Sequence, residues 1–295
     1  MMNALRAPRI RFGIFRRARR AAAITLVWLA AGALPSAACA SELATDPKAL
    51  ARAMEGRRIV VLGEVHDNPA QHALRLSALK ILVDGGARPA LAFEQFDREW
   101  QADIDRARRE RPRDADYVIA AGKGAPSWRW ELYRPYVQLA LDYDLPIVAA
   151  NLSRRGAMDV AMQTRGPEPA SVPAGVQHAH EDAIAKGHCN LLPPDALPGM
   201  ANAQIARDRT LAESLRTHAA RGVVLLTGNG HARIDIGVPF WLTPDERRVS
   251  TSIGVLERDD EDGAGEAAGR FDAFVLTASA ERPDPCEELR KRYRK

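Results

Sequence analysis

Histidine and glutamate residues follow several short apolar runs, where they could carry out chemistry. Glu64 and His66 follow one run, Glu94 ends a second, and His231 follows a third. Each of these histidines closes a Gly-x-x-His motif, and 165 positions separate them. Two imidazoles with one or two carboxylates suit zinc, manganese or another divalent metal with an open coordination position. We predict a metal site at His66, Glu94 and His231, with Glu64 or Glu94 as general base if the protein is a hydrolase.

The same polar groups could instead only satisfy backbone groups at the ends of strands. Asp67 and Asn68 are expected to do so, as caps of the next helix. For His66, Glu94 and His231 we favour a functional site, because carboxylates are rarely buried without a partner. Four more residues are candidates around the same crevice: His72, Asn151, Arg154 and Arg233.

Four apolar runs must position these groups. They are continuous rather than alternating, which is typical of strands buried on both faces of a parallel sheet. Between the first two runs, Asn68 and Pro69 begin a helix that Gly85 and Gly86 end, so this region predicts a βαβ unit. In open α/β sheets, ligands bind beyond the carboxyl ends of the strands. The runs are 58–62, 90–93, 145–150 and 222–227.

The rest of the chain predicts the other elements of the fold. Segments 97–143 and 157–220 are expected to be helical and to form a smaller subdomain, and runs 249–256 and 271–277 read as a C-terminal hairpin. The predicted fold class is α/β, with three layers and a mainly parallel sheet flanked by helices. One domain would cover residues 41–295.

The N-terminus carries the positive charge of the chain. Residues 1–40 hold seven of the 42 basic residues and no acid, which leaves 35 basic against 38 acidic residues. Seven arginines, the apolar run 21–33 and the small residues before position 41 are typical of a signal peptide. We predict export to the periplasm or cell envelope, with cleavage after Ala40 favoured over a lipid anchor through Cys39. The mildly acidic remainder argues against nucleic-acid binding.

Export would leave two cysteines, Cys189 and Cys286, in an oxidising compartment, so a disulfide between them is expected. Such a bond would contribute roughly 4–5 kcal/mol in the chain-entropy model. His188, beside Cys189, is a further candidate ligand, whereas His178 and His180 are expected on the surface.

Four aromatic residues form the run Trp128, Trp130, Tyr133 and Tyr136. They could line the binding site of a flat cofactor such as a porphyrin. We favour the simpler reading, in which Trp130, Tyr133 and Val137 form one helical stripe that packs on the sheet. Tyr133 stays a candidate cofactor ligand.

Several segments together resemble the ChaN family of haem-binding, iron-regulated proteins, which belongs to a superfamily with Tiki proteases, TraB proteins and erythromycin esterases. The segments occur in the family's order over most of the chain beyond residue 40: 61–69 (VLGEVHDNP), 91–96 (LAFEQF), 146–151 (PIVAAN), 188–190 (HCN), 203–208 (AQIARD) and 228–233 (GNGHAR).

This resemblance implies a parallel α/β domain with a helical part, export, and a role in haem uptake. It also implies a metal site at His66, Glu94 and His231, with Glu64 beside them. In the characterised haem-binding mode a tyrosine ligates haem that two subunits share, yet no tyrosine here falls in a matched motif.

The leading hypothesis is an exported haem-binding protein, with a homodimer and haem-uptake machinery as partners. The candidate haem-binding residues are His66, His231, Tyr133 and His188. Two alternatives are a metal-dependent hydrolase and an inert scaffold that retains a partner.

Overall fold

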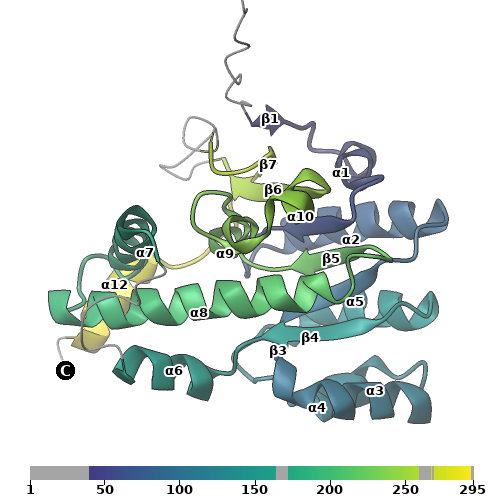
Figure 1. The fold of residues 1–295 in the computed structure, drawn as a ribbon, viewed down its shortest axis with the longest axis horizontal. Coiled ribbons are helices and arrows are strands. Elements are labelled where there is room, and N and C mark those ends of the chain that lie inside the picture. The colour runs from purple at the N-terminus through teal and green to yellow at the C-terminus, as the bar shows by residue number, and fades with distance from the viewer. Residues whose placement is uncertain (1–39, 164–171, 259–266, 268, 294–295) are drawn as a thin grey trace, which may run out of the picture. The chain divides into compact units, whose positions relative to one another are not determined.

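The computed structural model describes residues 40–163, 172–258, 267 and 269–293 (Figure 1). Their strands form one seven-stranded sheet in the order β1-β7-β6-β2-β5-β3-β4. Every pair of neighbouring strands is parallel. The strands are β1 (Ser41–Glu42), β2 (Ile59–Leu62), β3 (Ala90–Asp97), β4 (Ile147–Asn151), β5 (Val223–Leu226), β6 (Ser250–Glu257) and β7 (Ala273–Thr277).

Helices cover both faces of this sheet. Alternate residues of a strand point to opposite faces of the sheet. Val60 and Leu62 of β2 pack in one core cluster, and Ile59 and Val61 pack in the other. The first cluster receives residues from α1 (Pro47–Met54), α2 (Pro69–Asp84), α3 (Gln101–Glu110), α4 (Ala115–Ala121) and α5 (Trp130–Asp142), and the second from α8 (Leu197–Arg216). Figure 1 shows α8 in front of the sheet and α2 and α5 behind it. All residues of β2 and β5 are buried, as the continuous apolar runs predict.

The predicted βαβ unit is present. The Asn68 side chain accepts hydrogen bonds from the amides of Ala70 and Gln71, and Pro69 occupies the first turn of α2. Both segments predicted to be helical contain helices, and their grouping into a subdomain stays a prediction. The helices are α1 (Pro47–Met54), α2 (Pro69–Asp84), η1 (Arg98–Trp100), α3 (Gln101–Glu110), α4 (Ala115–Ala121), α5 (Trp130–Asp142), α6 (Arg154–Gln163), α7 (Ala174–Gly187), η2 (Pro194–Ala196), α8 (Leu197–Arg216), α9 (Asn229–Ala232), η3 (Val238–Trp241), α10 (Pro244–Arg248) and α12 (Pro285–Tyr293).

The predicted C-terminal hairpin is wrong. Strands β6 and β7 are neighbours, but they run parallel, with Ile253 opposite Ala273 and Glu257 opposite Thr277. The chain between them is therefore a crossover connection rather than a hairpin turn. Residue pattern could not decide this, because alternation along a strand marks its two faces and carries no information on its direction.

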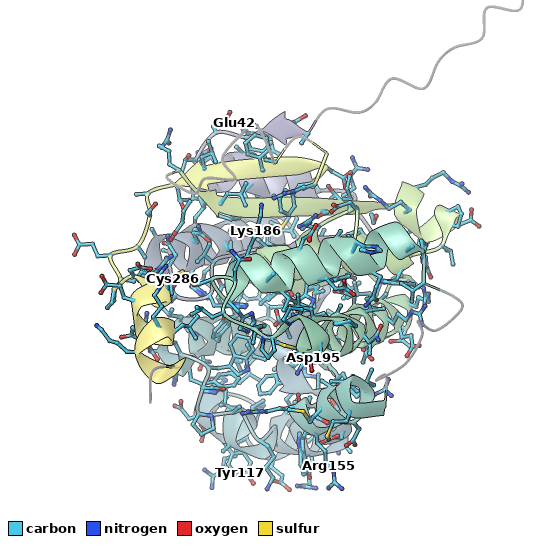
Figure 2. All side chains as sticks on the ribbon, turned by 90° about the vertical axis from the view of Figure 1, so that its left-hand side faces the viewer. Glu42, Tyr117, Arg155, Lys186, Asp195 and Cys286 are labelled. Atoms are coloured by element: carbon cyan, nitrogen blue, oxygen red, sulfur yellow. A yellow bond between two sulfur atoms is a disulfide. The ribbon has the colours of Figure 1, made fainter. Side chains whose placement is uncertain are left out.

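The predicted disulfide is present between Cys189 and Cys286 (Figure 2). It joins the residues just beyond α7 to the first turn of α12, across a sequence separation of 97. Cys189 and Asn190 both have positive φ, so the chain turns sharply after α7. The bond therefore holds the C-terminal end of α7 against α12.

The predicted signal peptide and the possible anchor residue Cys39 lie outside the described residues, so both stay predictions. In the part of the chain that the structure describes, no helix has the length and apolar character needed to cross a membrane.

Candidate functional site

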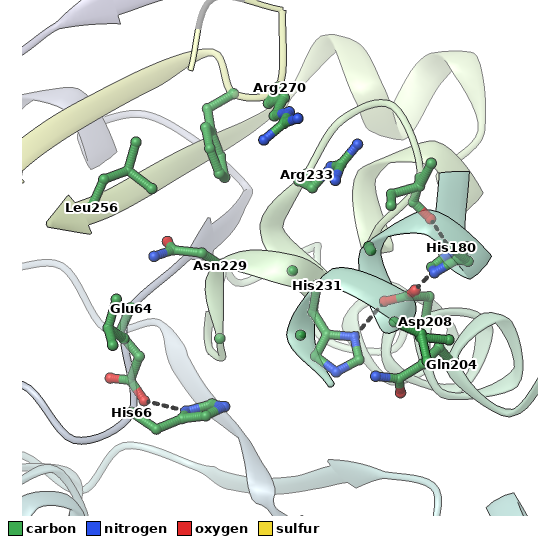
Figure 3. A pocket seen from close by; sticks show the side chains of 18 of the residues that line it. Glu64, His66, His180, Gln204, Asp208, Asn229, His231, Arg233, Leu256 and Arg270 are labelled. Atoms are coloured by element: carbon green, nitrogen blue, oxygen red, sulfur yellow. Dashed lines mark hydrogen bonds and ion pairs between the residues drawn. The ribbon is translucent and has the colours of Figure 1, made fainter. Parts of the chain in front are cut away.

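A cavity of about 600 Å³ lies beyond the carboxyl ends of β2, β3 and β5, where the crevice was predicted (Figure 3). Glu64 and His66 reach it from the loop after β2, Glu94 from β3, and His231 from α9 after β5. Residues of α7 and α8 form another wall of this cavity. The predicted candidate Arg233, which follows α9, also lines the cavity. Residues separated widely in sequence thus share one pocket, because all parallel strands end at the same edge of the sheet.

Glu64 is the centre of a buried polar cluster beneath this pocket. Its Oε1 accepts a 2.5 Å hydrogen bond from the Tyr133 hydroxyl and lies 3.1 Å from His66 Nδ1. Its Oε2 pairs with the Arg75 guanidinium and lies 3.4 Å from His72 Nε2. The buried carboxylate is therefore hydrogen-bonded through Oε1 and paired with a cation through Oε2.

This cluster orients His66. With Nδ1 directed at Glu64, the imidazole presents Nε2 on its other side, and the side chain is 44% exposed. Its ring also meets Trp128 edge to face, with centroids 4.9 Å apart. His66 is therefore a fixed imidazole that faces the cavity with an available nitrogen.

Both motif glycines are required for close packing. A Cβ on Gly228 would lie 2.8 Å from the His66 ring, and a Cβ on Gly63 would lie 2.3 Å from the side-chain oxygen of Asn229. Neither glycine has positive φ, so their role is close approach rather than an unusual backbone turn. The first Gly-x-x-His motif thus packs directly against the second.

Glu94, His231 and Asp208 form a second buried cluster. Glu94 Oε2 accepts hydrogen bonds from Thr227 Oγ1 at 2.6 Å and from the Gly228 amide at 2.9 Å, while its Oε1 lies 3.6 Å from His231 Nε2. On the other side of the ring, His231 Nδ1 donates to Asp208 Oδ1 at 2.6 Å. The imidazole therefore lies between two carboxylates.

These contacts decide the charges of the cluster. Burial alone would raise the pKa of Glu94, but the positive charge of His231 and the hydrogen bonds from Thr227 and Gly228 outweigh it and lower the pKa to about 2. Burial alone would lower the pKa of His231, but Asp208 and Glu94 outweigh it and raise the pKa to about 9. At neutral pH, Glu94 is ionised and His231 is protonated.

The predicted metal set, His66, Glu94 and His231, shares one pocket. Both ring nitrogens of His231 lie near carboxylates, with Nε2 3.6 Å from Glu94 and Nδ1 2.6 Å from Asp208. Among the residues that the structure describes, no three His, Cys, Asp or Glu side chains are arranged to hold a metal ion.

Two further predicted residues support the site from behind. Asn151 donates to the Glu94 backbone carbonyl at 2.7 Å and accepts from Arg207. His72 Nε2 lies 3.1 Å from the His66 carbonyl, and burial lowers the pKa of His72 to about 4, so it is neutral. The predicted candidate Arg154 is not part of the site, because it is exposed at the start of α6 and does not line the pocket.

The two expected helix caps differ. Asn68 caps α2 as predicted, and its amide also donates to Glu257 at 2.6 Å. Asp67 is not a cap; its carboxylate pairs with Arg282 at 3.1 Å. The expectation for Asp67 was therefore wrong, because the N-cap position falls one residue later.

Tyr133 and Tyr136 of the aromatic run are buried in the interior, Trp130 packs against the core, and Trp128 is half-buried beside His66. Tyr136 and Val137 belong to the first core cluster, with Trp130 packed against it. Tyr133 is fully buried, its hydroxyl is committed to Glu64, and it does not line the cavity. Burial raises the pKa of Tyr133, so it stays protonated. The preferred reading of this segment is confirmed.

Three important residues were missed or misjudged. His180, expected on the surface, is 5% exposed; its Nε2 donates to the Ile236 carbonyl and lies 3.7 Å from Asp208. Asp208 was not selected as a site residue, and Arg75 was not considered. Each is a charged or polar residue within an otherwise apolar helical face, and that is the signal that could have found them.

Comparison with known proteins gives the family. Residues 50–242 match the family described as haem-binding uptake, Tiki superfamily, ChaN. No protein of curated function matches the chain. The ChaN protein of Campylobacter jejuni, solved with cofacial haem binding, is 21% identical, with a TM-score of 0.60 over 68% of this chain and 82% of that one. The type III effector HopBA1 is 12% identical, with a TM-score of 0.46 over 84% of this chain and all of that one.

A mutant of the erythromycin esterase EreC in its open conformation is 13% identical, with a TM-score of 0.44 over 70% of this chain and 72% of that one. At 21% identity the Campylobacter jejuni structure shows likeness of fold alone. The family match is different in kind, because it covers well over half of the chain and includes both Gly-x-x-His motifs. This chain belongs to the ChaN family of haem-binding uptake proteins.

Proposed function

We propose that this protein binds haem in the pocket beyond the carboxyl ends of the strands and serves haem uptake outside the cytoplasm. The observation that carries the proposal is the state of His66. Its Nδ1 is held by the buried carboxylate of Glu64, and its Nε2 faces the cavity. A carboxylate behind a histidine fixes the ring and makes the opposite nitrogen a better iron ligand.

The cavity fits a flat, mainly apolar ligand with polar edges. Its volume lies within the range of small-molecule sites, about 300–1,000 Å³. Apolar side chains from four separate segments of the chain form much of its wall, among them Ile184, Ile236, Leu256 and Phe271. When bound, haem would supply an iron centre with an open coordination position, and the chain's own residues would orient the imidazole and exclude water.

Two of the four candidate ligands already have polar partners. His231 lies between Glu94 and Asp208, and Tyr133 is buried with its hydroxyl on Glu64. His188 remains as a second candidate, since it lines the pocket from the end of α7. Its Nδ1 donates to the Ile184 carbonyl at 2.8 Å, so its Nε2 is also available.

Titration with hemin tests the assignment. Protein beginning at Ser41 should develop a saturable, shifted Soret band, and His66→Ala should weaken or shift that band. His188→Ala shows whether the second imidazole contributes. His178→Ala is the matched control, because His178 makes the same contact four residues back along α7, at 2.7 Å, but does not line the pocket. The proposal is refuted if wild-type protein gives an unsaturable titration, or if His66→Ala and His188→Ala both leave the spectrum unchanged.

Export and assembly belong to the same proposal. The basic, apolar N-terminus supports secretion, and family membership supports a partner in haem uptake and a homodimer. Cell fractionation with N-terminal sequencing of the mature protein tests export, and a protein beginning at Met1 in the cytoplasm would contradict it. Sedimentation with and without hemin tests the dimer.

The metal-dependent hydrolase predicted as an alternative has less support. It would need His66 and His231 as ligands, yet His231 is committed to two carboxylates. Metal analysis of protein purified without an affinity tag provides the test. Stoichiometric zinc or manganese that is lost in His66→Ala would favour the hydrolase over the haem-binding function.

A further inference from the structure

Helix α7 forms one wall of the pocket with its second half. Ala183, Ile184 and Gly187 line the cavity from this helix, and His188 follows at its end. The first half of α7 packs elsewhere, because Val176 belongs to a third, small core cluster that is separate from the two clusters on the sheet. This wall of the pocket is therefore a helix end that neither main core cluster holds.

The hydrogen bonds that join α7 to other elements also lie in its first half. Gln177 donates to the Pro198 carbonyl at 3.4 Å, and His180 donates to the Ile236 carbonyl at 3.1 Å. Within the described residues, no hydrogen bond or ion pair joins residues 181–188 to another element. The disulfide of Cys189 is therefore the bond that fixes this end of α7 to the rest of the fold.

The backbone turn after α7 also needs a constraint to hold it. Cys189 and Asn190 have φ angles of 56° and 54°, in the left-handed region that residues with a Cβ rarely adopt in succession. Such conformations persist where the surrounding structure fixes them. Opening the disulfide removes this constraint, so the turn can relax and move the end of α7 with it.

The second cysteine, Cys286, stands on the exposed helix α12, which lies beside α7 (Figure 1). The segment before α12 is anchored by Arg282, which pairs with Glu257 at the end of β6 and with Asp67 in the loop after β2. The residues from Arg282 to Cys286 thus form a strap between two sides of the pocket. One end of the strap holds the loop after β2, and the other end holds α7.

The strap lies outside the part of the chain that carries the family match. That match ends at residue 242, so it includes Cys189 but neither the strap nor α12. The disulfide therefore adds to the matched region a tie that the C-terminal segment of this chain supplies.

We propose that the disulfide between Cys189 and Cys286 is a redox latch that holds the α7 wall of the pocket closed. This inference rests on the proposed function and adds a regulation of the pocket. When a dithiol reduces the S–S bond, two electrons and two protons pass to the cysteine sulfurs and the dithiol becomes a disulfide. The strap then separates from α7 and the wall opens. A disulfide oxidant reverses this exchange, and because such oxidants act outside the cytoplasm, the wall closes after export.

Hydrogen exchange without any ligand tests the latch directly. Protein beginning at Ser41 is measured as purified and after reduction with dithiothreitol. We expect the amides of residues 183–188 to exchange about tenfold or more faster after reduction, because that end of α7 then has only its own helical hydrogen bonds. The amides of β2 should stay protected over the same labelling times in both states. Loss of protection in β2 as well would mean global unfolding and would overturn the latch.

Two variants break the same bond from its two ends. Cys189→Ser and Cys286→Ser should each give the fast exchange of residues 183–188 without reductant, and dithiothreitol should change neither further. Leu289→Ala is the matched control in α12, because it trims another half-buried side chain of this helix and leaves the disulfide intact. It should keep the slow exchange. Fast exchange in only one serine variant, or in Leu289→Ala, would show a local packing effect and overturn the latch.

Release of bound hemin tests the consequence for the pocket. The rate of hemin transfer to excess apomyoglobin is compared between wild type and the two serine variants, without reductant because thiols bind haem iron. Both variants should release hemin about tenfold or more faster, in step with the exchange of α7. Unchanged release despite faster exchange would show that α7 does not close the pocket, which also overturns the proposal. If wild-type protein binds no hemin, the proposed function fails, and the exchange experiment still decides whether the disulfide holds α7.

Discussion

Breaking the buried pair of Glu64 and Arg75 should strongly destabilise this fold, and Arg75→Met tests this. The Arg75 side chain is fully buried, pairs with Glu64, and donates to the Leu62 carbonyl at 2.9 Å. Methionine keeps much of the packed stem but leaves the carboxylate of Glu64 without its cation. Removing one member of a buried ion pair costs about 3–5 kcal/mol of unfolding free energy. We expect a loss of this size at pH 7.

A double-mutant cycle makes this prediction specific to the pair. Glu64→Gln should also destabilise, since it leaves Arg75 buried and unpaired, whereas the double variant should lose less than the sum of the singles by about 2–3 kcal/mol. Arg134→Met is the exposed control, and breaking its surface pair with Asp116 should leave the free energy of unfolding nearly unchanged. Urea unfolding with the disulfide intact measures all four variants against wild type.

Two results would refute this reasoning. The first is a loss below about 1 kcal/mol in Arg75→Met, which falls outside the range for a buried pair. The second is additivity of the two single substitutions. Either would mean that the surrounding protein or water compensates the charge of Glu64 without Arg75.

Four further predictions follow from the site. The pKa of Glu94 is lowered from its ordinary value of 4.5 to about 2, so the ionised carboxylate stabilises the fold above pH 4.5 and this stabilisation is lost as the pH falls toward 2. The unfolding free energy of Glu94→Gln should therefore lack this dependence on pH. The pKa of His231 is raised from 6.5 to about 9, so the protonated ring stabilises the fold below pH 6.5 and this stabilisation is lost as the pH rises through 9. In His231→Gln the unfolding free energy should therefore decline less between pH 6.5 and 9. Cys286→Ser should lower the unfolding free energy by about 4–5 kcal/mol in the chain-entropy model, and equal denaturation midpoints for oxidised and reduced wild type would contradict this. Gly228→Ala should displace the His66 ring, since its Cβ would lie 2.8 Å away; we expect weaker hemin binding with unchanged far-UV circular dichroism, and unchanged affinity would count against it.

Much of the fold could be predicted because its local signals are strong. Continuous apolar runs become buried parallel strands, and Asn68-Pro69 begins α2 where capping chemistry requires. The error at the C-terminus has the opposite cause. Whether β6 and β7 run parallel depends on the path of the crossover between them, and no residue of either strand encodes that path.

The candidate site could also be predicted only in part. Gly-x-x-His motifs and a strand-end glutamate are visible in the sequence, so His66, Glu94 and His231 could be assigned to one pocket. Their state could not be predicted, because it depends on partners that only the fold supplies. Asp208 reaches His231 from α8, and Arg75 reaches Glu64 from α2. The contacts of His231 with Asp208 and Glu94 raise its pKa, which residue types in the sequence do not show.

The sequence by itself determined the family, the parallel α/β architecture, the edge of the sheet where the site lies and the disulfide partners. These follow from residue types and local order, which a linear chain displays directly. Only the tertiary structure decided which imidazole keeps an available nitrogen, and that the disulfide lies at the end of the pocket wall formed by α7. Protonation and the position of that wall depend on charges and backbone segments brought together from distant positions, so they arise only when the chain has folded.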